Sequence, residues 1–369
     1  MSDEKMKEYQ TKIERMYNLM DQKGYNAIVI GTQTNFSWLS CGGTGKLLLT
    51  SDIAAAYCII TKTNRYLVAY TMDGPRNIEE ELDGMGFEPV FIRWYENTLE
   101  GKVLELLGNK KILSDIPLEG ANVSMKEFYG LHYPLISAEI DRYKKIDQDA
   151  ERLLRSVVDQ IKPGIKETEV EAMIISEFVK AEYFPIVLLL GSDERIMKYR
   201  HLIAKEKKID KYLLLILAMR KFGLNAVLTR SVYFGDKLPD DIYRKFTAAS
   251  TIAANCIAST IPGTKFSAIL EMQKRLYIEL GFPEEWKNHF QGGITGYVCN
   301  DSSLALDLDA IIVDKQTCNW FITITGVNTE DTCISGKDGG EVFTQTGSWP
   351  LKEYATGNQS IKMPDILYK

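Results

Sequence analysis

Residues 212–234 read YLLLILAMRKFGLNAVLTRSVYF, and this stretch decides the fold class of the second half of the chain. The aliphatic run from Tyr212 to Met219 predicts a buried strand, and Arg220 to Gly223 supplies a turn. Leu224 to Phe234 predicts the return strand. The sequence therefore predicts a long β-hairpin here.

The register of this hairpin depends on where its turn is centred. We expect the centre between Lys221 and Phe222, which pairs Ile216 with Val227 across the two strands. A second, shorter hairpin is expected later in the chain, around a glycine-rich turn between two short apolar segments: Thr332–Ile334, Gly336–Gly340 and Glu341–Phe343.

Two segments of the second half resemble each other, and each lies between two helical patterns. They are IKPGIKETEV, from Ile161, and TIPGTKFSAI, which begins 99 residues later at Thr260. Both contain Pro-Gly, a Lys three positions on, and a Ser or Thr that can cap the next helix. Because the flanks match as well, a duplicated helix–turn–helix is favoured over a chance pair of Pro-Gly turns.

The first 145 residues read as a compact α/β domain. Apolar residues at helical spacing predict an amphipathic helix that ends at Lys23-Gly24, and later helices are expected around 76–85 and 99–107. Short apolar segments alternate with these helices and predict strands at 27–30, 54–60, 66–70, 89–92 and 111–113.

A polar stretch, Asp141–Asp147, precedes a long helical pattern from Asp149 to Ile161. We place the domain boundary at this stretch, with domains at 1–145 and 146–369. A solvated helix start is the alternative interpretation of the same residues.

Composition excludes several classes of protein. The 369 residues are 45% apolar and 25% charged, which is typical of a globular chain of about two domains. The net charge of −6 argues against a nucleic-acid partner. No apolar run approaches the ~20 residues that span a membrane. The N-terminus, MSDEKMKEYQ, lacks a secretory apolar region, and the six cysteines form no C-x-x-C pair, so a cytoplasmic protein with reduced thiols is expected.

Two superficial motifs are set aside. Cys41–Lys46 looks like a phosphate loop, but Ser40 and Leu47 stand where the pattern needs Gly and Ser or Thr. Three aspartates suggest a calcium loop, but the glycine and terminal glutamate of that loop are missing, so a solvated acidic loop is favoured: Asp301, Asp307 and Asp309.

With these elements in place, the chain resembles the creatinase / Xaa-Pro aminopeptidase family, the pita-bread proteins, over nearly its whole length. The first part is similar to the family's N-terminal α/β domain, including NFSWLS at Asn35–Ser40. More specific matches follow in the second part: LTR at 228–230, HFQGGITGY at 289–297 and GVNTEDT at 326–332. The resemblance implies an α/β domain followed by an α+β pita-bread domain with a pseudo-two-fold, which would explain the repeat.

Peptidases of this family hold two metal ions with two Asp, one His and two Glu. The matching positions here are Ile216 and Val227 for the Asp pair, His289, Phe321 for the first Glu, and Glu330. Apolar side chains cannot coordinate a divalent cation. The resemblance therefore implies that the dinuclear site is lost and that neither a metal nor another cofactor is bound. The alternative is that nearby side chains supply the missing bonds: Asp331, Asp301 or Cys299.

A metal-free site remains possible, because the family's creatinase branch uses a histidine as its acid–base group. His201, 15 residues before Ile216, matches that position. We expect His201 to act with His289 and Glu330 as the catalytic set, and the two imidazoles to lie within roughly 12 Å in one cleft. Three further residues are candidates for substrate binding: Arg230, Gln291 and Arg76.

Structural interpretations compete with these roles. Both histidines could be retained in a decayed site, Arg230 could form an ion pair with an acidic neighbour, and Arg76 could begin an exposed helix.

Three functions follow, in order of preference. The first is a metal-independent hydrolase of a C–N bond in a small peptide-like or guanidino substrate. The second is a pseudoenzyme that binds a small peptide, a metabolite or a partner protein. The third is a metallopeptidase with substitute ligands. In the first two cases we expect a small-molecule or short-peptide ligand, no nucleic-acid or membrane partner, and a homodimer, as the resemblance implies.

Overall fold

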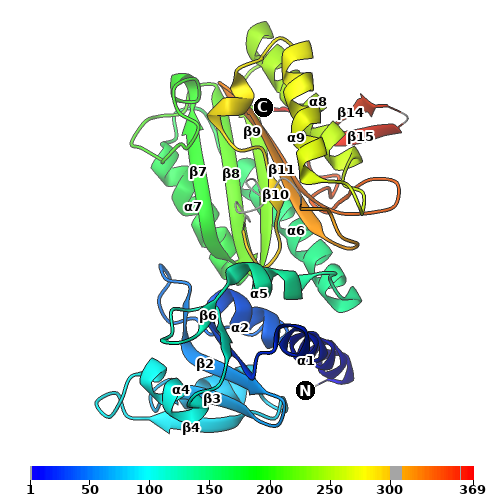
Figure 1. Ribbon diagram of the computed structural model, residues 1–369. Helices are drawn as coiled ribbons and strands as arrows, with labels where there is room; N and C mark the ends of the chain where they lie inside the picture. The colour runs from blue at the N-terminus through cyan, green and yellow to red at the C-terminus, as the bar shows by residue number, and fades with distance from the viewer. Residues whose placement is uncertain (1, 300–309, 358) are drawn as a thin grey trace. The chain divides into compact units, whose positions relative to one another are not determined.

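The computed structural model describes residues 2–299, 310–357 and 359–369, so the acidic loop proposed for Asp301, Asp307 and Asp309 lies outside the described residues. The chain divides into two units, Met1–Ala138 and Glu139–Lys369 (Figure 1). In the described part of the chain, no helix is both long and apolar enough to cross a membrane.

The first unit is built on a six-stranded sheet in the order β4-β3-β2-β1-β5-β6. Five strands lie where the apolar segments predict them: β1 (Ala27–Thr32), β2 (Ile53–Thr61), β3 (Arg65–Tyr70), β4 (Glu88–Ile92) and β5 (Ile112–Ser114). The short strand β6 (Asn122–Val123) was not predicted. Strand β1 is antiparallel to β2 and parallel to β5, so the sheet is mixed. The predicted α/β class of this unit is confirmed.

The helices of the first unit are α1 (Asp3–Lys23), α2 (Gln33–Leu39), α3 (Gly74–Arg76), the π-helix η1 (Asn77–Glu81), α4 (Leu99–Leu107) and α5 (Met125–His132). Two of them, α1 and α4, follow the sequence pattern, whereas α2 and α5 were not predicted. Helix α1 ends at Gly24, which takes a left-handed conformation at φ 71°. The helix expected around 76–85 is instead a short α-turn that continues as a π-helix.

The second unit contains an eight-stranded sheet with β10-β11-β12-β9-β8-β7 as its main path. Its strands are β7 (Phe184–Ser192), β8 (Tyr212–Lys221), β9 (Leu224–Tyr233), β10 (Gly293–Ile294), β11 (Thr317–Ile324), β12 (Val327–Ile334), β13 (Glu341–Val342) and β16 (Leu367–Tyr368). A separate hairpin joins β14 (Leu351–Thr356) and β15 (Gln359–Pro364). The predicted hairpin near Gly336–Gly340 is confirmed, because β12 pairs with β13.

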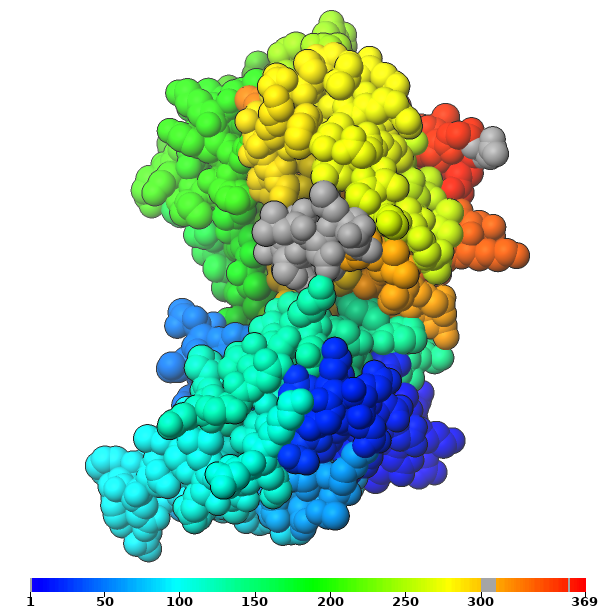
Figure 2. Space-filling model, viewed as in Figure 1, coloured from blue at the N-terminus to red at the C-terminus, as the bar shows by residue number. Residues whose placement is uncertain are grey.

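Helices cover one face of this sheet. They are α6 (Ser137–Val158), α7 (Glu167–Lys180), α8 (Asp240–Ala258) and α9 (Phe266–Glu279), with 3-10 turns η2 (Asp193–Arg195) and η3 (Glu285–Asn288). Helices α8 and α9 form much of the yellow surface of the second unit in Figure 2. The indole of Trp320 on β11 donates to Thr260, directly after α8, which fixes that helix against the sheet.

The internal repeat is confirmed as two helix–turn–helix units. Gly164 lies between α6 and α7, and Gly263 between α8 and α9, at φ 94° and 92°. Each glycine N–H donates to a carbonyl far along the chain, that of Ile209 or Ile312, at 2.8 Å in both cases. Glycine suits both turns because other residues rarely adopt this positive φ.

The register of the β8–β9 hairpin differs from the prediction. Ile216 lies opposite Thr229, and Val227 lies opposite Ala218. Phe222 and Gly223 both have positive φ, 53° and 78°, as the two central residues of a type I′ turn do. The turn centre therefore lies one residue later than expected, so Ile216 and Val227 are diagonal neighbours on the same face.

The polar stretch Asp141–Asp147 is helical rather than a linker, because α6 begins at Ser137. Its buried residues recur at helical spacing, with Tyr143, Ile146 and Ala150 on the face toward the sheet. The charged residues between them give this part of the helix the composition of a polar linker. The boundary proposed after residue 145 falls inside this helix.

Candidate functional site

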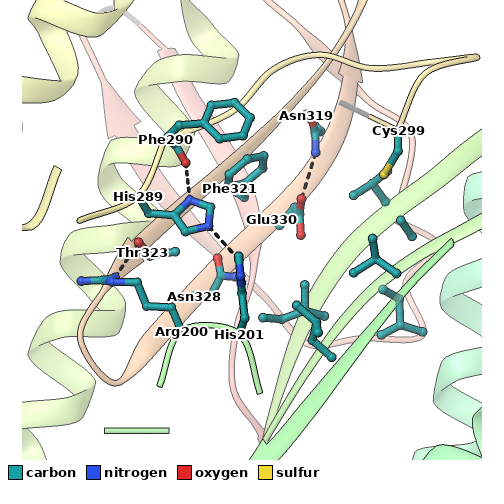
Figure 3. Close-up of a pocket in the computed structure, with 16 residues that line it drawn as sticks. Arg200, His201, His289, Phe290, Cys299, Asn319, Phe321, Thr323, Asn328 and Glu330 are labelled. Atoms are coloured by element: carbon teal, nitrogen blue, oxygen red, sulfur yellow. Dashed lines mark hydrogen bonds between the residues drawn. The ribbon is translucent and has the colours of Figure 1, made fainter. Parts of the chain in front are cut away.

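The face of the sheet opposite the helices carries a cavity of about 250 Å³ (Figure 3). Alternation along the strands determines its wall, because every second residue points the same way. The wall is mostly apolar: Val187, Leu189, Ile216, Ala218, Val227 and Phe321. The polar side chains that enter it come from β11, β12 and two segments that carry histidines.

His201 and His289 meet at this cavity although they are 88 positions apart, and their Nε2 atoms are 3.0 Å apart. The two rings are nearly perpendicular, at 88°. The expected closeness of the two imidazoles is therefore present in the structure. Burial lowers the pKa of His289, and the charges of His201 and Arg200 lower it further.

Hydrogen bonds assign the tautomers of this pair. Nδ1 of His289 contacts the backbone carbonyl of Phe290, which is an acceptor only, so this nitrogen carries the proton. In the neutral ring Nε2 is then an acceptor, and Nε2–H of His201 donates to it. The remaining basic nitrogen of the pair is Nδ1 of His201.

Glu330 is the carboxylate of the cavity. Its two oxygens accept from the Thr229 hydroxyl at 2.8 Å and from the Asn319 amide at 2.9 Å. Burial raises the pKa of Glu330 to about 7, more than these bonds lower it. A carboxyl that titrates near neutrality in a cleft is typical of a functional group.

Arg200 and Glu285 tie the two histidine segments together. The Arg200 guanidinium pairs with Glu285, four residues before His289, and donates to the Thr323 hydroxyl at 2.7 Å. Glu285 also accepts from the Thr325 N–H at 3.1 Å. Burial alone would raise the pKa of Glu285, but these bonds hold it below its usual range. Since Arg200 directly precedes His201, this pair anchors both imidazoles to β11.

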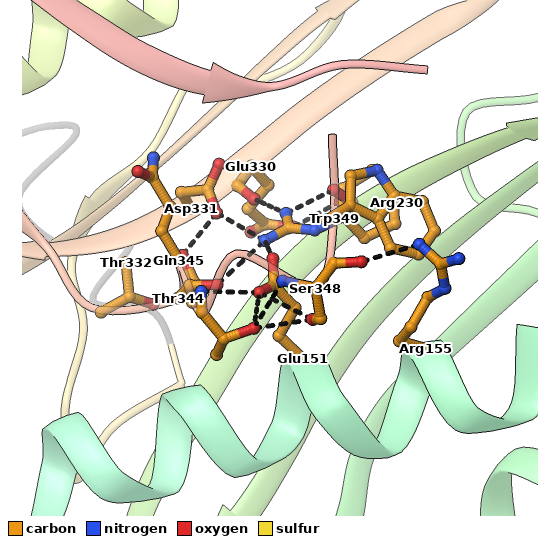
Figure 4. A network of polar contacts seen from close by, with 12 residues as sticks. Glu151, Arg155, Arg230, Glu330, Asp331, Thr332, Thr344, Gln345, Ser348 and Trp349 are labelled. Atoms are coloured by element: carbon orange, nitrogen blue, oxygen red, sulfur yellow. Dashed lines mark hydrogen bonds and ion pairs between the residues drawn. The ribbon is translucent and has the colours of Figure 1, made fainter. Parts of the chain in front are cut away.

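Arg230 does not reach the cavity, so its assignment as a substrate contact is not supported by its position. Its side chain is buried on the helix face of the sheet (Figure 4). It donates to Glu151 on α6 at 2.8 Å and to Asp331 at 3.0 Å. The same guanidinium donates to the backbone carbonyl of Thr229 at 2.9 Å, where β9 meets β12. Arg230 therefore forms a structural ion pair with acidic neighbours, as the alternative interpretation of the sequence proposes.

Gln291 is not part of the cavity wall, and Arg76 belongs to the other unit of the chain. Gln291 is buried and bridges the hydroxyl of Tyr277 and the backbone carbonyl of His289, so it supports the histidine segment from behind. Arg76 belongs to the first unit, where it pairs with Glu81 at 3.0 Å. Neither placement provides a substrate contact within its own unit.

Comparisons with known proteins agree with this architecture. The model of metallopeptidase family M24 matches residues 141–306, and no curated protein matches the sequence. The Xaa-Pro dipeptidase from Bacillus anthracis has a TM-score of 0.74 at 16% identity, covering 98% of this chain and 100% of that one. The chain therefore has the pita-bread fold of these dipeptidases, and residues 141–306 match the M24 family model.

Other solved structures show how widely this pita-bread fold is shared. The prolidase from Pyrococcus horikoshii OT3 has a TM-score of 0.75 at 17% identity, covering 91% of this chain and 98% of that one. The N-terminal domain of FACT complex subunit SPT16 from chickpea, Cicer arietinum, has a TM-score of 0.69 at 13% identity, covering 92% and 96%. The fold of this pita-bread protein is therefore common to structures named as peptidases and to one named as a complex subunit.

The donors on the described wall do not suit the metal pair of an M24 peptidase. Ile216, Val227 and Phe321, which the resemblance matches to three of the five ligands, line the cavity. Among the described residues, no three His, Cys, Asp or Glu side chains come together as a metal site. One carboxylate cannot offset the repulsion between two divalent cations.

The proposed substitute ligands are also poorly placed. Asp331 points to the helix face, where it is paired with Arg230. Cys299 lines the cavity, but burial and the charge of Glu330 raise the pKa of its thiol to about 12, so it is not a thiolate near neutrality. Asp301 lies outside the described residues.

Sequence reasoning missed Arg200, Glu285, Asn319 and Asn328. A period of two from Glu330 reaches Asn328, and a period of two from Phe321 reaches Asn319 and Thr323, so strand alternation was the available signal. No local signal connects Arg200 to Glu285, which are separated by 85 positions.

Proposed function

We propose that this protein is a metal-independent hydrolase that cleaves a C–N bond in a small peptide-like or guanidino substrate. One observation carries the proposal: His201 and His289 share a hydrogen bond of 3.0 Å at the edge of an apolar cavity that also holds Glu330. Two linked imidazoles can accept and return a proton near neutral pH without a metal ion.

The assigned tautomers suggest how the proton moves. Nδ1 of His201 takes a proton from a water molecule as its oxygen attacks the substrate carbon, and the resulting imidazolium is stabilised by its bond to Nε2 of His289. The same proton then passes to the leaving nitrogen as the C–N bond breaks. Glu330, in its ionised form, stabilises positive charge on the substrate nitrogen. Water adds across the bond, and His201 returns to its starting state.

A panel of Xaa-Pro and other dipeptides, small amides, creatine and related guanidino compounds tests this proposal. The chelator-treated protein is expected to turn over at least one compound class, with no gain from added metal. His201→Ala is expected to lose about 10²–10⁴-fold in kcat/KM. Glu284→Gln, an exposed carboxylate near the same segment, is the matched control and should keep full activity. Absence of turnover across the panel, or activity that requires metal, would refute the proposal.

The second candidate is a binding module without catalysis. Both oxygens of Glu330 already accept hydrogen bonds from the protein, which favours a group that holds a ligand over one that activates water. The shared fold with a subunit of a complex is compatible with this function. Saturable ligand binding with no turnover, and equal binding by wild type and His201→Ala, would support it.

The proposed assembly is a homodimer in the cytoplasm. Two-fold dimers are the commonest assembly of soluble oligomers, and the resemblance to prolidases favours one here. Light scattering should give twice the chain mass of 41.8 kDa, and a single 41.8 kDa species at micromolar concentration would contradict the dimer. Fluorescence microscopy of a tagged chain tests the location.

A further inference from the structure

The segment that carries His201 leaves the sheet at the end of β7 and returns to it at β8. This His201 segment comprises Asp193–Lys211. His201 itself is exposed, whereas Leu202 beside it is fully buried, and the Leu202 carbonyl accepts from the backbone N–H of Leu190 at 2.9 Å. An exposed imidazole receives little support from packing, so the contacts of the rest of the segment determine where His201 lies.

The carboxylate of Glu167, the first residue of α7, binds the chain on both sides of His201. It is fully buried. Its Oε1 accepts from the backbone N–H and the hydroxyl of Ser192, both at 2.8 Å. Its Oε2 accepts from the guanidinium of Arg195 and from the backbone N–H of Lys205, the latter at 3.0 Å. One side chain therefore joins the end of β7 to two points of the segment that flank the histidine.

Arg195 extends this anchor towards His201. One nitrogen of its guanidinium pairs with Glu167, and another donates to the backbone carbonyl of Ile203 at 2.7 Å. Ile203 lies two positions after His201, so the ion pair reaches the backbone close to the imidazole. A planar guanidinium binds two partners in a fixed geometry, which links the buried carboxylate to the backbone beside the histidine.

The internal repeat shows that the turn before α7 does not itself require a carboxylate. Phe266 lies 99 positions after Glu167 and begins α9 as Glu167 begins α7. The backbone N–H of Glu167 donates to the carbonyl of Lys207 at 2.9 Å. The backbone N–H of Phe266 donates to the carbonyl of Ala310 at 3.0 Å. The same kind of backbone bond forms with a carboxylate in one repeat and a phenyl ring in the other, so the side chain of Glu167 serves the His201 segment rather than the turn.

Asp193 holds the foot of the same segment, away from the histidine. Its carboxylate accepts from three consecutive backbone N–H groups, at 3.0, 2.8 and 2.9 Å: Asp210, Lys211 and Tyr212. These bonds tie the first residue of the segment to its end, where the chain enters β8. Glu167 acts instead on Arg195 and Lys205, between which His201 lies.

We infer that Glu167 is a positioning residue, which fixes the His201 segment so that the imidazole of His201 meets that of His289. Glu167 is not among the residues that line the cavity, so it acts through His201 and not on a ligand. The inference deepens the proposed function, on which it rests for the role of His201. The distance of 3.0 Å between the two Nε2 atoms leaves little room for displacement, because a hydrogen bond weakens steeply when its geometry is lost (Figure 3).

Hydrogen–deuterium exchange of the full chain carrying Glu167→Gln is the first test. The amide oxygen of the variant can still accept from Ser192, but its amide nitrogen cannot accept from Arg195 or Lys205. We expect the backbone amides of residues 193–205 to exchange about tenfold faster than in wild type, because two hydrogen bonds of the segment are lost. Exchange in β8 and β9 should stay unchanged, which shows that the protein remains folded.

The bond between the two imidazoles gives a readout that a purely structural role of Glu167 would not change. In ¹⁵N-labelled protein at about pH 8, where an imidazole is neutral, an N–H···N bond produces a ¹⁵N–¹⁵N coupling across it. We expect this coupling between His201 and His289 in wild type and its loss in Glu167→Gln. Glu206, an exposed carboxylate of the same segment that pairs with Lys166, supplies the matched control. Glu206→Gln should change neither the exchange nor the coupling.

Arg195→Gln decides the question if Glu167→Gln does not fold. In this variant three donors remain for the Glu167 carboxylate: the hydroxyl and the N–H of Ser192, and the N–H of Lys205. Exchange in residues 193–205 should again be faster, and the coupling weaker. Wild-type exchange and an intact coupling in the folded Glu167→Gln protein, or in Arg195→Gln if the first variant unfolds, would overturn the inference.

Neither readout uses a substrate, so the inference and the hydrolase can fail separately. Loss of the coupling in Glu167→Gln, without turnover of any compound by wild type, would refute the hydrolase and support the positioning role. Turnover by wild type with an intact coupling in Glu167→Gln would refute the positioning role and leave the hydrolase intact. Absence of the coupling in the wild-type protein would overturn the inference as well.

Discussion

Glu330 and Asp331 are neighbours on β12, and they point to opposite faces of the same sheet. Asp331 faces the helices, where the Arg230 guanidinium pairs with it and with Glu151. Glu330 faces the cavity, where in the described part of the chain a hydroxyl and an amide donate to its side chain. The carboxylate on the helix face is paired with a cation, whereas no described residue forms an ion pair with Glu330.

The helix face carries a further carboxylate, Asp147 on α6. Both of its oxygens lack a hydrogen-bond partner in the part of the chain that the structure describes. Burial raises the pKa of Asp147 well above its usual value, and the charge of Asp331 raises it further. Burial therefore favours the neutral form of Asp147.

The largest expected effect comes from removing the cation of the helix face. Arg230→Met should lower the free energy of unfolding by about 3–5 kcal/mol, because it leaves Glu151 and Asp331 buried without a cation. Urea denaturation measures the change. Arg152→Met, which removes an exposed pair with Asp149, is the control and should change stability by less than about 1 kcal/mol. If Arg230→Met lowers the free energy of unfolding by less than about 1 kcal/mol as well, the helix face does not depend on this cation to compensate its buried carboxylates.

The free energy of unfolding should depend on pH through Glu330 on the cavity face. The pKa of Glu330 rises from 4.5 in the unfolded chain to about 7 in the folded protein, so the folded state holds the proton more tightly. Its contribution to stability is therefore complete below pH 4.5 and is lost as pH rises through 7, by about 3 kcal/mol. Glu330→Gln should remove this part of the pH dependence. Identical unfolding curves for wild type and variant across pH 5–8 would contradict the assignment.

Removing the Arg200–Glu285 ion pair should change the free energy of unfolding only slightly but should alter the contact between His201 and His289. Glu285→Gln removes the ion pair with Arg200 and is expected to cost about 1 kcal/mol. The contact between His201 and His289 should weaken, so their imidazole signals in ¹⁵N NMR should shift, while His132, buried in the first unit, stays unchanged. The charge-exchanged double variant, Arg200→Glu with Glu285→Arg, should restore much of the signal. Unchanged imidazole signals in Glu285→Gln would show that the pair does not position the histidines.

The smallest expected effect is at Asp147. Because burial favours the neutral form of its carboxyl group, Asp147→Asn should change the free energy of unfolding by less than about 0.5 kcal/mol at pH 6. A loss above about 2 kcal/mol would mean that the helix face holds a third charged carboxylate. Chemical denaturation at pH 6, beside Arg230→Met, provides the comparison.

Local patterns predicted much of the fold. Apolar periodicity and turn residues, which act over a few positions, predicted five strands of the first unit, α1, α4, the Pro-Gly repeat and both hairpins. The register of the long hairpin was wrong because the turn type depends on the positive φ of Phe222, which its sequence does not reveal. The start of α6 was missed because charged residues cover its exposed face.

Some features of the candidate site were predicted from the sequence and others were not. The family resemblance predicted that His201, His289 and Glu330 lie in one cavity. It did not reveal that Arg230 faces the helices, since this depends on Glu151, 79 positions away. The Arg200–Glu285 pair arises from tertiary contacts, which no short segment contains.

The central claim is that the cavity works through its own side chains rather than through a metal pair. Elemental analysis of protein purified without chelator, followed by calorimetric titration with Mn²⁺, Co²⁺ and Zn²⁺, tests it most directly. We predict less than one tightly held metal equivalent per chain, and no change in any metal titration when Glu330 is replaced by Gln. Two tightly held equivalents per chain that are lost in Glu330→Gln or His289→Ala would contradict the account and restore the metallopeptidase.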